Sequence, residues 1–155
     1  MTEISKDEQV CRDFDWFCLD EAGHIGHFAS AGFKLLPNSV GRSAEDLEIV
    51  TRYFEKELTE EGDYVLDENL VEQVPDFESI YLKSFIEIAA KGLFSYDIAS
   101  HLSPGISYFR VALPRKPLRV EQLPNQIREI VERTVLKGIL LRGSSRIAYQ
   151  DTLGM

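Results

Sequence analysis

The chain has 155 residues, of which 44% are hydrophobic and 28% charged, and its formal net charge is -9. This length and composition are typical of one folded globular domain, and the acidity argues against a nucleic-acid-binding role because phosphates would be repelled. The polar N-terminus and the lack of an apolar run of roughly 18 residues argue against a secretory signal and a membrane span. We therefore expect a single cytoplasmic domain over residues 1–155.

A β-hairpin over residues 16–30 is the first clear element, after a polar stretch of residues 1–10 that we expect to be weakly ordered. Two apolar runs flank the sequence Asp-Glu-Ala-Gly at positions 20–23, and glycine supplies the positive φ that such a turn usually needs. Apolar side chains occupy both faces of this ribbon, so we expect it to lie inside a sheet and to be covered by later elements. A loop centred near residue 22 places Cys18 opposite Gly26.

Three helices are predicted from N-caps, apolar spacing and glycine stops. Ser43 is a good N-cap for an amphipathic helix over residues 44–60, which ends before Gly62. Acidic residues near the end of this helix oppose the negative pole of its macrodipole. A second, more buried helix is predicted over residues 76–91, and a third over residues 124–137.

Strands are predicted over residues 93–98 and 106–113, with a further short one over residues 118–120. We expect the end of the chain, residues 143–155, to be weakly ordered. Strands and helices are only partly interleaved along the chain, which favours α+β over a parallel βαβ array. The predicted fold is α+β, with a mostly antiparallel sheet built around the N-terminal hairpin and packed by about three helices.

The residues most able to carry chemistry lie in the hairpin, and their spacing argues against a shared site. His24 and His27 point to opposite faces of an extended strand, so they do not form a metal site with Asp20 or Cys18. The two cysteines, Cys11 and Cys18, lack a CxxC spacing, and we expect both to be free thiols. Phosphate-binding and nucleophile motifs are absent from the chain. We therefore predict no catalytic residue, no cofactor and no metal.

The negative charge is concentrated between residues 55 and 78, where ten acids accompany one lysine, whereas the rest of the chain has sixteen acids and sixteen bases. Such a run is most often a solvated face. Acids that surround tyrosine and aliphatic side chains also suit docking onto a basic protein, because complementary charge raises the association rate. The candidate partner-binding residues are Glu60, Glu61, Asp63, Tyr64, Asp67, Glu68 and Glu72.

A basic stretch runs through residues 110–146, with nine lysines and arginines against three glutamates. In the third predicted helix, Arg128 and Arg133 interleave with Glu129 and Glu132 as intrahelical ion pairs do. Because the chain as a whole is acidic, we expect no nucleic-acid partner.

Two parts of the chain resemble a known group of proteins. They are residues 16–28, which read WFCLDEAGHIGHF, and the later segments KGLFSYD at 91–97, LPRKPL at 113–118 and LP at 123–124. These patterns are similar to small uncharacterised bacterial proteins, some of which are immunity proteins of polymorphic toxin systems. The resemblance implies a non-enzymatic protein that neutralises a cognate toxin by binding it, and it assigns no individual site residue.

Three functional hypotheses remain open. The leading one is a cytoplasmic, non-enzymatic protein that binds a basic toxin partner through its acidic surface. The alternative is a small enzyme or ligand-binding domain whose pocket is lined by Trp16, Cys18, His27 and Tyr96. A closed face at these residues counts against that alternative, and a deep pocket with a histidine and a thiol counts for it. The third is a structural subunit of an assembly, which a large exposed apolar patch would indicate.

Overall fold

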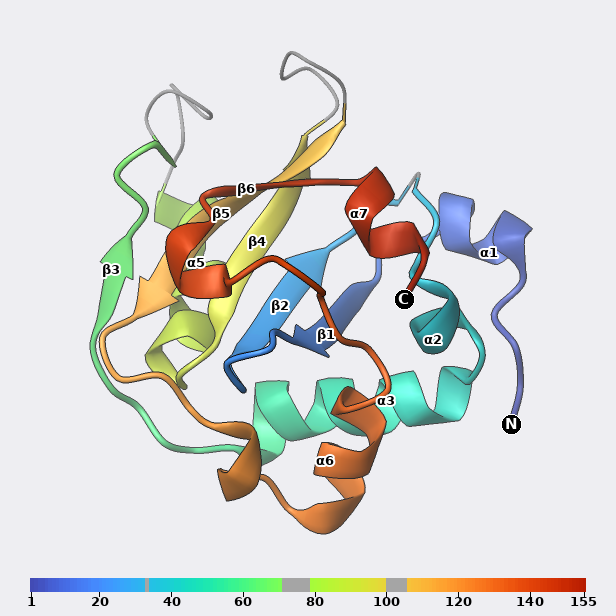
Figure 1. Ribbon diagram of the computed structural model, residues 1–155, viewed down its shortest axis with the longest axis horizontal. Coiled ribbons are helices and arrows are strands. Elements are labelled where there is room, and N and C mark those ends of the chain that lie inside the picture. The colour runs from blue at the N-terminus through green and yellow to red at the C-terminus, as the bar shows by residue number, and fades with distance from the viewer. Residues whose placement is uncertain (33, 71–78, 100–105) are drawn as a thin grey trace.

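One sheet organises the fold. The computed structural model describes residues 1–32, 34–70, 79–99 and 106–155. Within them the strands are β1 (Asp15–Leu19), β2 (Ile25–Ala29), β3 (Tyr64–Leu66), β4 (Phe94–Ala99), β5 (Ser107–Pro114) and β6 (Arg146–Ala148). Neighbouring strands follow the order β1-β2-β4-β5-β3, and β6 also pairs with β5. The pairing of β2 with β4 is parallel and the others are antiparallel, which confirms the predicted α+β fold with a mostly antiparallel sheet (Figure 1).

The hairpin formed by β1 and β2 has the register that the sequence predicts. Gly23 has a φ of 81° in the connecting turn, and Cys18 lies opposite Gly26. The prediction that the hairpin lies inside the sheet holds for β2, which has a strand on each side, whereas β1 is an edge strand. Both faces of the hairpin are nevertheless covered, because its apolar side chains on each face pack against other elements.

The helices lie around this sheet (Figure 1). They are α1 (Lys6–Cys11), α2 (Asn38–Gly41), α3 (Ala44–Arg52), α5 (Ser79–Ala90), α6 (Asn125–Val131) and α7 (Gln150–Leu153), together with the 3-10 turns η2 (Val120–Gln122) and η3 (Leu141–Gly143). Helix α3 continues as a π-helical turn, η1 (Tyr53–Glu57), so the predicted helix over residues 44–60 is present with a wider last turn. The start of the predicted helix over residues 76–91 lies outside the described residues.

Both ends of the α3–η1 helix are stabilised by side chains. The Ser43 hydroxyl accepts a hydrogen bond of 3.2 Å from the Asp46 amide, which is the N-cap that the sequence predicts. At the other end, the Lys91 ammonium donates to the carbonyls of Phe54 and Glu55 at 2.7 and 2.9 Å. A cation from a distant part of the chain therefore compensates for the acids that oppose the helix macrodipole.

The two faces of the sheet carry separate sets of aromatic side chains. On one face, the Phe28 ring is stacked between the rings of Trp16 and Tyr96, with centroid distances of 4.4 and 4.7 Å. The C-terminal segment, red in Figure 1, covers this face, and the Tyr96 hydroxyl donates to its Leu141 and Ser144 carbonyls. On the opposite face Phe17 packs against Phe54 of η1 at a centroid distance of 4.7 Å. The C-terminal segment and α3–η1 thus cover opposite faces of the hairpin.

The third predicted helix, over residues 124–137, is shorter than expected, because α6 ends at Val131. The chain beyond it runs beside the outer edge of β1. The Leu19 amide donates to the Thr134 carbonyl at 2.9 Å, and the Leu136 amide donates to the Leu19 carbonyl at 2.8 Å. The edge strand β1 has backbone N–H and C=O groups that need hydrogen-bond partners. The extended residues 134–136 supply partners at Leu19, which they could not do if α6 continued.

Both chain ends make contacts with the rest of the fold. Near the N-terminus Ile4 is buried, and its amide donates to the Gly41 carbonyl at 2.8 Å. Near the C-terminus Ile147 and Thr152 are buried, and the segment forms β6 and α7. The segments expected to be weakly ordered, residues 1–10 and 143–155, thus contribute buried side chains to the fold, and such apolar contacts favour an ordered conformation.

The predicted strand over residues 118–120 is reduced to a single bridge between Arg119 and His24, after which the chain turns into η2. Among the described residues, no helix combines the length and the apolar character that crossing a membrane requires.

Candidate functional site

Most of the predicted partner-binding residues lie at the edge of the sheet formed by β3. Tyr64 and Val65 are 39% and 37% exposed, whereas most residues of β1, β2, β4 and β5 are buried, and acidic side chains flank them. We name this region the β3 surface; its exposed residues are Glu60, Glu61, Asp63, Tyr64, Val65 and Glu68. Glu72, also predicted to bind the partner, lies outside the described residues. The structure thus brings five of the predicted side chains together on an exposed edge.

Asp67 does not belong to this surface, which corrects its predicted role. It is 4% exposed, and its carboxylate accepts a hydrogen bond of 2.7 Å from the Arg110 guanidinium. The same guanidinium donates to the carbonyls of Leu141 and Arg142. Asp67 is internal because a buried cation on β5 needs a counter-charge, and the local sequence contains no sign of that partner.

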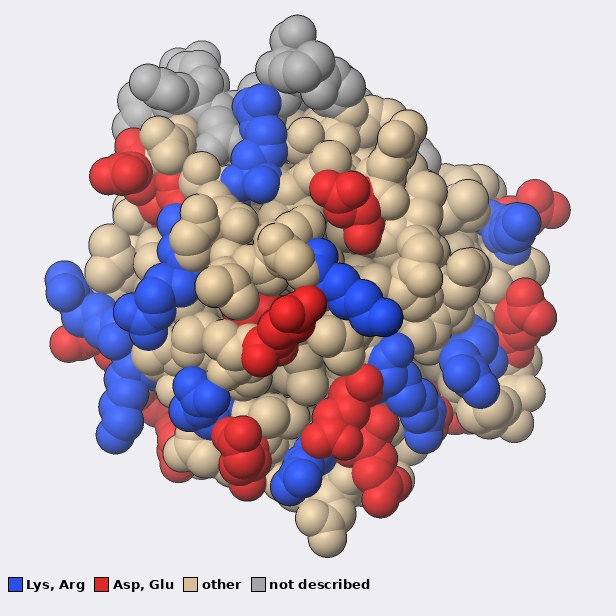
Figure 2. Space-filling view, in the orientation of Figure 1, with Lys and Arg blue, Asp and Glu red and all other residues tan. Residues whose placement is uncertain are grey.

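The charge around the β3 surface is mixed rather than uniformly negative. Arg115 and Lys116 follow β5 and are exposed, and the Arg115 amide donates to the Asp63 carbonyl at 3.0 Å. Figure 2 shows lysine and arginine side chains interspersed with acidic ones over one face of the molecule. On the face shown, the acidic and basic segments of the chain are therefore not separated into two charged regions.

The alternative pocket near Trp16, Cys18 and His27 is not formed. Trp16, Cys18 and Tyr96 are completely buried and packed together on one face of the sheet. Burial raises the pKa of the Cys18 thiol above its usual range, so the thiol is protonated at neutral pH. His27 lies opposite Phe17, on the other face. The thiol and the histidine are therefore separated by the sheet itself.

The His27 side chain instead joins a polar cluster that the sequence analysis missed. Its Nδ1 atom is 2.7 Å from the Ser95 hydroxyl, and its Nε2 atom is 3.5 Å from the Asp15 carboxylate. Glu55 of η1 hydrogen-bonds with Asp15. We name Asp15, His27, Glu55 and Ser95 the hairpin cluster. The observed register places Asp15 and His27 on one face of the hairpin, whereas the predicted hairpin begins at residue 16 and leaves Asp15 out. Ser95 and Glu55 reach them only through the fold.

The two carboxyl groups of the hairpin cluster have pKa values that are shifted in opposite directions. Burial raises the pKa of Glu55, and the charge and hydrogen bond of Asp15 raise it further. Burial alone would raise the pKa of Asp15 as well, but its hydrogen bond and attraction to His27 lower it overall. Two carboxyl groups with separated pKa values can hold one proton between them.

A second polar pair lies on the same face of the sheet. The Tyr81 hydroxyl of α5 donates to the Asp97 carboxylate of β4 at 2.5 Å. Burial raises the pKa of both groups above their usual ranges. Asp97 and Asp15 both neighbour Ala29 of β2 across the sheet, so this pair extends the polar region beside the hairpin cluster.

A groove of about 480 Å³ opens between α1 and α3, next to the hairpin cluster. Asp15 and Glu55 line it together with the apolar side chains of Ile4, Phe14 and Leu47. His27 is only 3% exposed and lies behind Asp15. The groove therefore combines apolar side chains and a carboxyl pair with charged residues of both signs, whereas the histidine and serine have an internal position; the further charged residues are Glu8, Arg12, Asp13, Glu48, Arg52 and Lys56.

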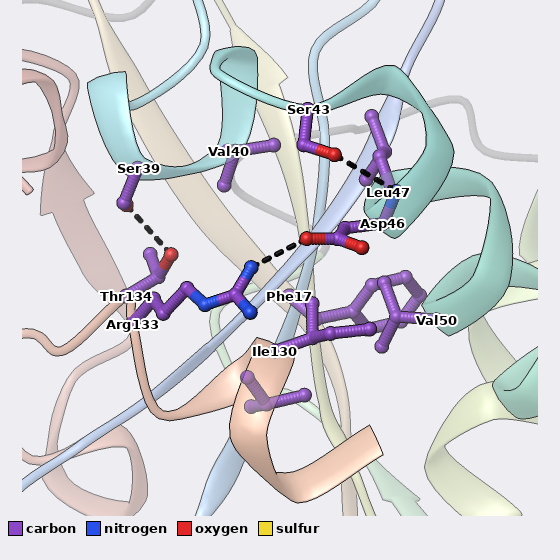
Figure 3. Close-up of a pocket in the computed structure, with 11 residues that line it drawn as sticks. Phe17, Ser39, Val40, Ser43, Asp46, Leu47, Val50, Ile130, Arg133 and Thr134 are labelled. Carbon is purple, nitrogen blue, oxygen red and sulfur yellow. Dashed lines mark hydrogen bonds and ion pairs between the residues drawn. The ribbon is translucent and has the colours of Figure 1, made fainter. Parts of the chain in front are cut away.

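A smaller cavity lies where α2, α3 and α6 meet (Figure 3). Its volume is about 20 Å³, which is room for roughly one water molecule. Its polar rim is closed by a hydrogen bond of 2.7 Å between the Ser39 and Thr134 hydroxyls and by an ion pair between Arg133 and Asp46. These contacts join α2 and α3 to the segment that follows α6, and the cavity is too small for a substrate.

Asp20 and His24 have a structural position at the hairpin turn. The Asp20 carboxylate accepts hydrogen bonds from the amides of Ala22, His24 and Leu141. His24 Nδ1 is 3.7 Å from this carboxylate, and burial lowers the pKa of the imidazole. Within the described residues, no three histidine, cysteine or acidic side chains are grouped so as to hold a metal ion.

Comparison of the chain with protein-family models, with curated proteins and with solved structures found no match. The chemistry of the β3 surface and of the groove is therefore the basis for the function proposed below.

Proposed function

We propose that this chain is a cytoplasmic protein without enzymatic activity that binds and neutralises a basic protein partner, in the manner of an immunity protein. The observation that carries this proposal is the β3 surface, where an exposed tyrosine and valine lie among exposed carboxylates. An aromatic anchor inside a charged rim is the usual composition of a strong protein interface.

The proposed mechanism is occlusion. Carboxylates of Glu60, Glu61 and Asp63 pair with lysines or arginines that the partner needs for its own activity, and Tyr64 supplies a contact from which water is excluded. Opposite charges speed the encounter and disfavour acidic partners. The β3 surface thus selects its partner by charge and holds it by the apolar contact.

The proposal is tested by capture of the partner from the native host, with the product of the neighbouring gene as a defined bait. The variant in which Glu60, Glu61 and Asp63 are replaced by lysine should lose the partner, and its circular dichroism spectrum should stay unchanged. A matched control replaces the exposed acids Glu3, Asp7 and Glu129 by lysine, which makes the same change in net charge elsewhere. Equal loss of binding in both variants would show that total charge, not the β3 surface, is responsible.

A second candidate function rests on the groove between α1 and α3. Because Asp15 and Glu55 share a hydrogen bond there, a small organic cation that binds at this position can replace the shared proton. The apolar side chains of Ile4, Phe14 and Leu47 then contact its hydrocarbon part. This candidate replaces the predicted pocket at Trp16 and Cys18 by one on the opposite face of the sheet.

This candidate function is tested by titrating the isotope-labelled protein with a panel of small amines and following its amide NMR resonances. Binding should shift the amide resonances of Phe14, Asp15 and Glu55, and the double variant Asp15→Asn with Glu55→Gln should abolish it. Glu48→Gln is the matched control, since Glu48 lines the same groove away from the carboxyl pair. Shifts that survive in the double variant would remove this candidate.

A further inference from the structure

The two edges of the sheet differ in the hydrogen bonds that other segments make to them. At the end of β1, the outward backbone groups of Leu19 are bonded to residues 134 and 136. The outer side of β5 is occupied along its whole length, first by β3 and then by β6, with Arg110 at the junction. Strand β3 therefore forms the exposed margin at this end of the sheet, beside the exposed carboxylates of the β3 surface.

The backbone of β3 presents hydrogen-bonding groups away from β5. Asp63 accepts from Arg115, and Asp67 donates to Val111, so the odd-numbered residues between them face β5. By the alternation of an antiparallel ladder, the N–H and C=O groups of Tyr64 and Leu66 point outward. Within the described residues, no backbone group bonds to them on that side. Four backbone groups are thus available to another strand.

The charges beside this edge decide which strand it accepts. Glu60, Glu61 and Asp63 precede the strand and Glu68 follows it, whereas the neighbouring exposed cations are Arg115 and Lys116. Four carboxylates against two cations leave the edge net negative. A second copy of this chain would bring the same carboxylates to the edge and be repelled, whereas an extended basic segment would be attracted.

We propose that β3 binds an extended, lysine- or arginine-rich segment of the partner by strand addition, with backbone hydrogen bonds to Tyr64 and Leu66. This inference rests on the proposed function and names the mode of binding at the same surface. Backbone hydrogen bonds supply affinity that does not depend on the segment's sequence, and the flanking carboxylates supply the preference for basic side chains. Tyr64 and Val65 contact alternate side chains of the added strand on opposite faces.

The test uses a short end-blocked peptide that alternates lysine and valine, and two methylated derivatives. One is N-methylated at every backbone amide, and the other has its methyl groups on the lysine side-chain nitrogens instead. All three peptides have the same charge and nearly the same composition. Because a free strand can turn either edge toward β3, only methylation of the backbone on both edges removes every amide that could meet β3, so only the backbone-methylated derivative loses them. We expect that derivative to bind at least about tenfold more weakly, and the other to bind like the parent peptide.

Amide hydrogen exchange of the protein locates the contact. In the free protein the amides of Val65 and Asp67 should be protected, and those of Tyr64 and Leu66 should exchange rapidly. The parent peptide should slow exchange at Tyr64 and Leu66 selectively. Equal affinity of the two methylated peptides, no change at Tyr64 and Leu66, or no binding of the parent peptide would each overturn strand addition.

The outcomes separate this inference from the proposed function. If the variant with lysine at positions 60, 61 and 63 loses the parent peptide while both methylated peptides bind equally to the wild-type protein, the acidic surface binds basic chains without strand addition. If the β3 surface does not capture a native partner, the proposed function is wrong. Strand addition to β3 can still be correct in that case, provided that the peptide binds there.

Discussion

The guanidinium of Arg110 and the carboxylate of Asp67 form a buried ion pair with an Nε–Oδ2 distance of 2.7 Å. Arg110 lies on β5 at the point where β3 ends and β6 begins, and it also donates to the Leu141 and Arg142 carbonyls. One side chain therefore links the exposed edge of the sheet to the C-terminal segment that covers its face. The stability of the β3 surface depends on this internal contact.

Replacement of Asp67 by alanine should lower the free energy of unfolding by about 3 to 5 kcal/mol, because it leaves a buried guanidinium without a counter-charge. Urea denaturation followed by circular dichroism measures the change. The adjacent Glu68 is exposed, and Glu68→Ala should change the stability by less than about 0.5 kcal/mol. Equal effects of the two substitutions would mean that the Arg110 pair contributes nothing specific.

Replacement of Gly92 by alanine should destabilise the fold by about 2 kcal/mol or more. Gly92 has a φ of +109°, and an added Cβ would lie 2.6 Å from the backbone nitrogen of Leu118. Gly143 provides the control, since an added Cβ there meets no atom within 4 Å. Thermal unfolding of both variants should show a large decrease in Tm for Gly92→Ala alone. A small decrease for Gly92→Ala would show that Leu118 can move aside.

The two cysteines should differ sharply in reactivity. Cys11 is exposed, whereas Cys18 is buried with its pKa raised, so only one thiol per chain should react rapidly with an aromatic disulfide reagent in the native state. Both should react in denaturant. Cys11→Ser should remove the rapid phase and Cys18→Ser should leave it intact. A rapid phase that persists in Cys11→Ser would show that the face at Cys18 opens.

The carboxyl pair of the hairpin cluster should make stability depend on pH in a defined direction. The pKa of Glu55 is raised above its ordinary 4.5 in the folded state, so the native protein binds more protons than the unfolded chain above that pH. The stabilising effect of this proton is complete below pH 4.5 and is lost as the pH rises through the folded-state pKa of Glu55. Asp15, whose pKa is lowered from 3.8, acts oppositely and loses its contribution as the pH falls below that value.

Carbon-13 resonances of the side-chain carboxyls measure these titrations directly. We expect Glu55 to titrate above and Asp15 below their ordinary values, and Asp15→Asn to lower the pKa of Glu55 by removing the neighbouring negative charge. In Glu55→Gln, the fall in stability above pH 4.5 should be weaker than in the wild-type protein. An unchanged Glu55 titration in Asp15→Asn would show that burial alone raises its pKa.

Short sequence patterns were sufficient to predict those elements that are stabilised by contacts between residues close together along the chain. Glycine at position 23 between two alternating runs determines the hairpin and its register, and Ser43 determines the start of α3. Both depend on hydrogen bonds between residues that are close along the chain. The predicted hairpin begins at residue 16, so Asp15 was not assigned to the face of His27, although the observed register places it there.

The remaining features depend on partners that are distant along the chain. In the sequence, Asp67 cannot be told from the solvated acids around it, because its partner Arg110 is 43 residues away. Helix α6 ends before the predicted residue because Leu136 bonds to Leu19. The residues of the C-terminal segment are polar enough to suggest weak order, yet Ile147 is buried against the sheet. The sequence by itself determined the α+β class, the hairpin and the acidic character of the β3 region. Only the tertiary structure decided which acids are exposed and which edge is open, because burial and pairing at these sites are set by long-range contacts.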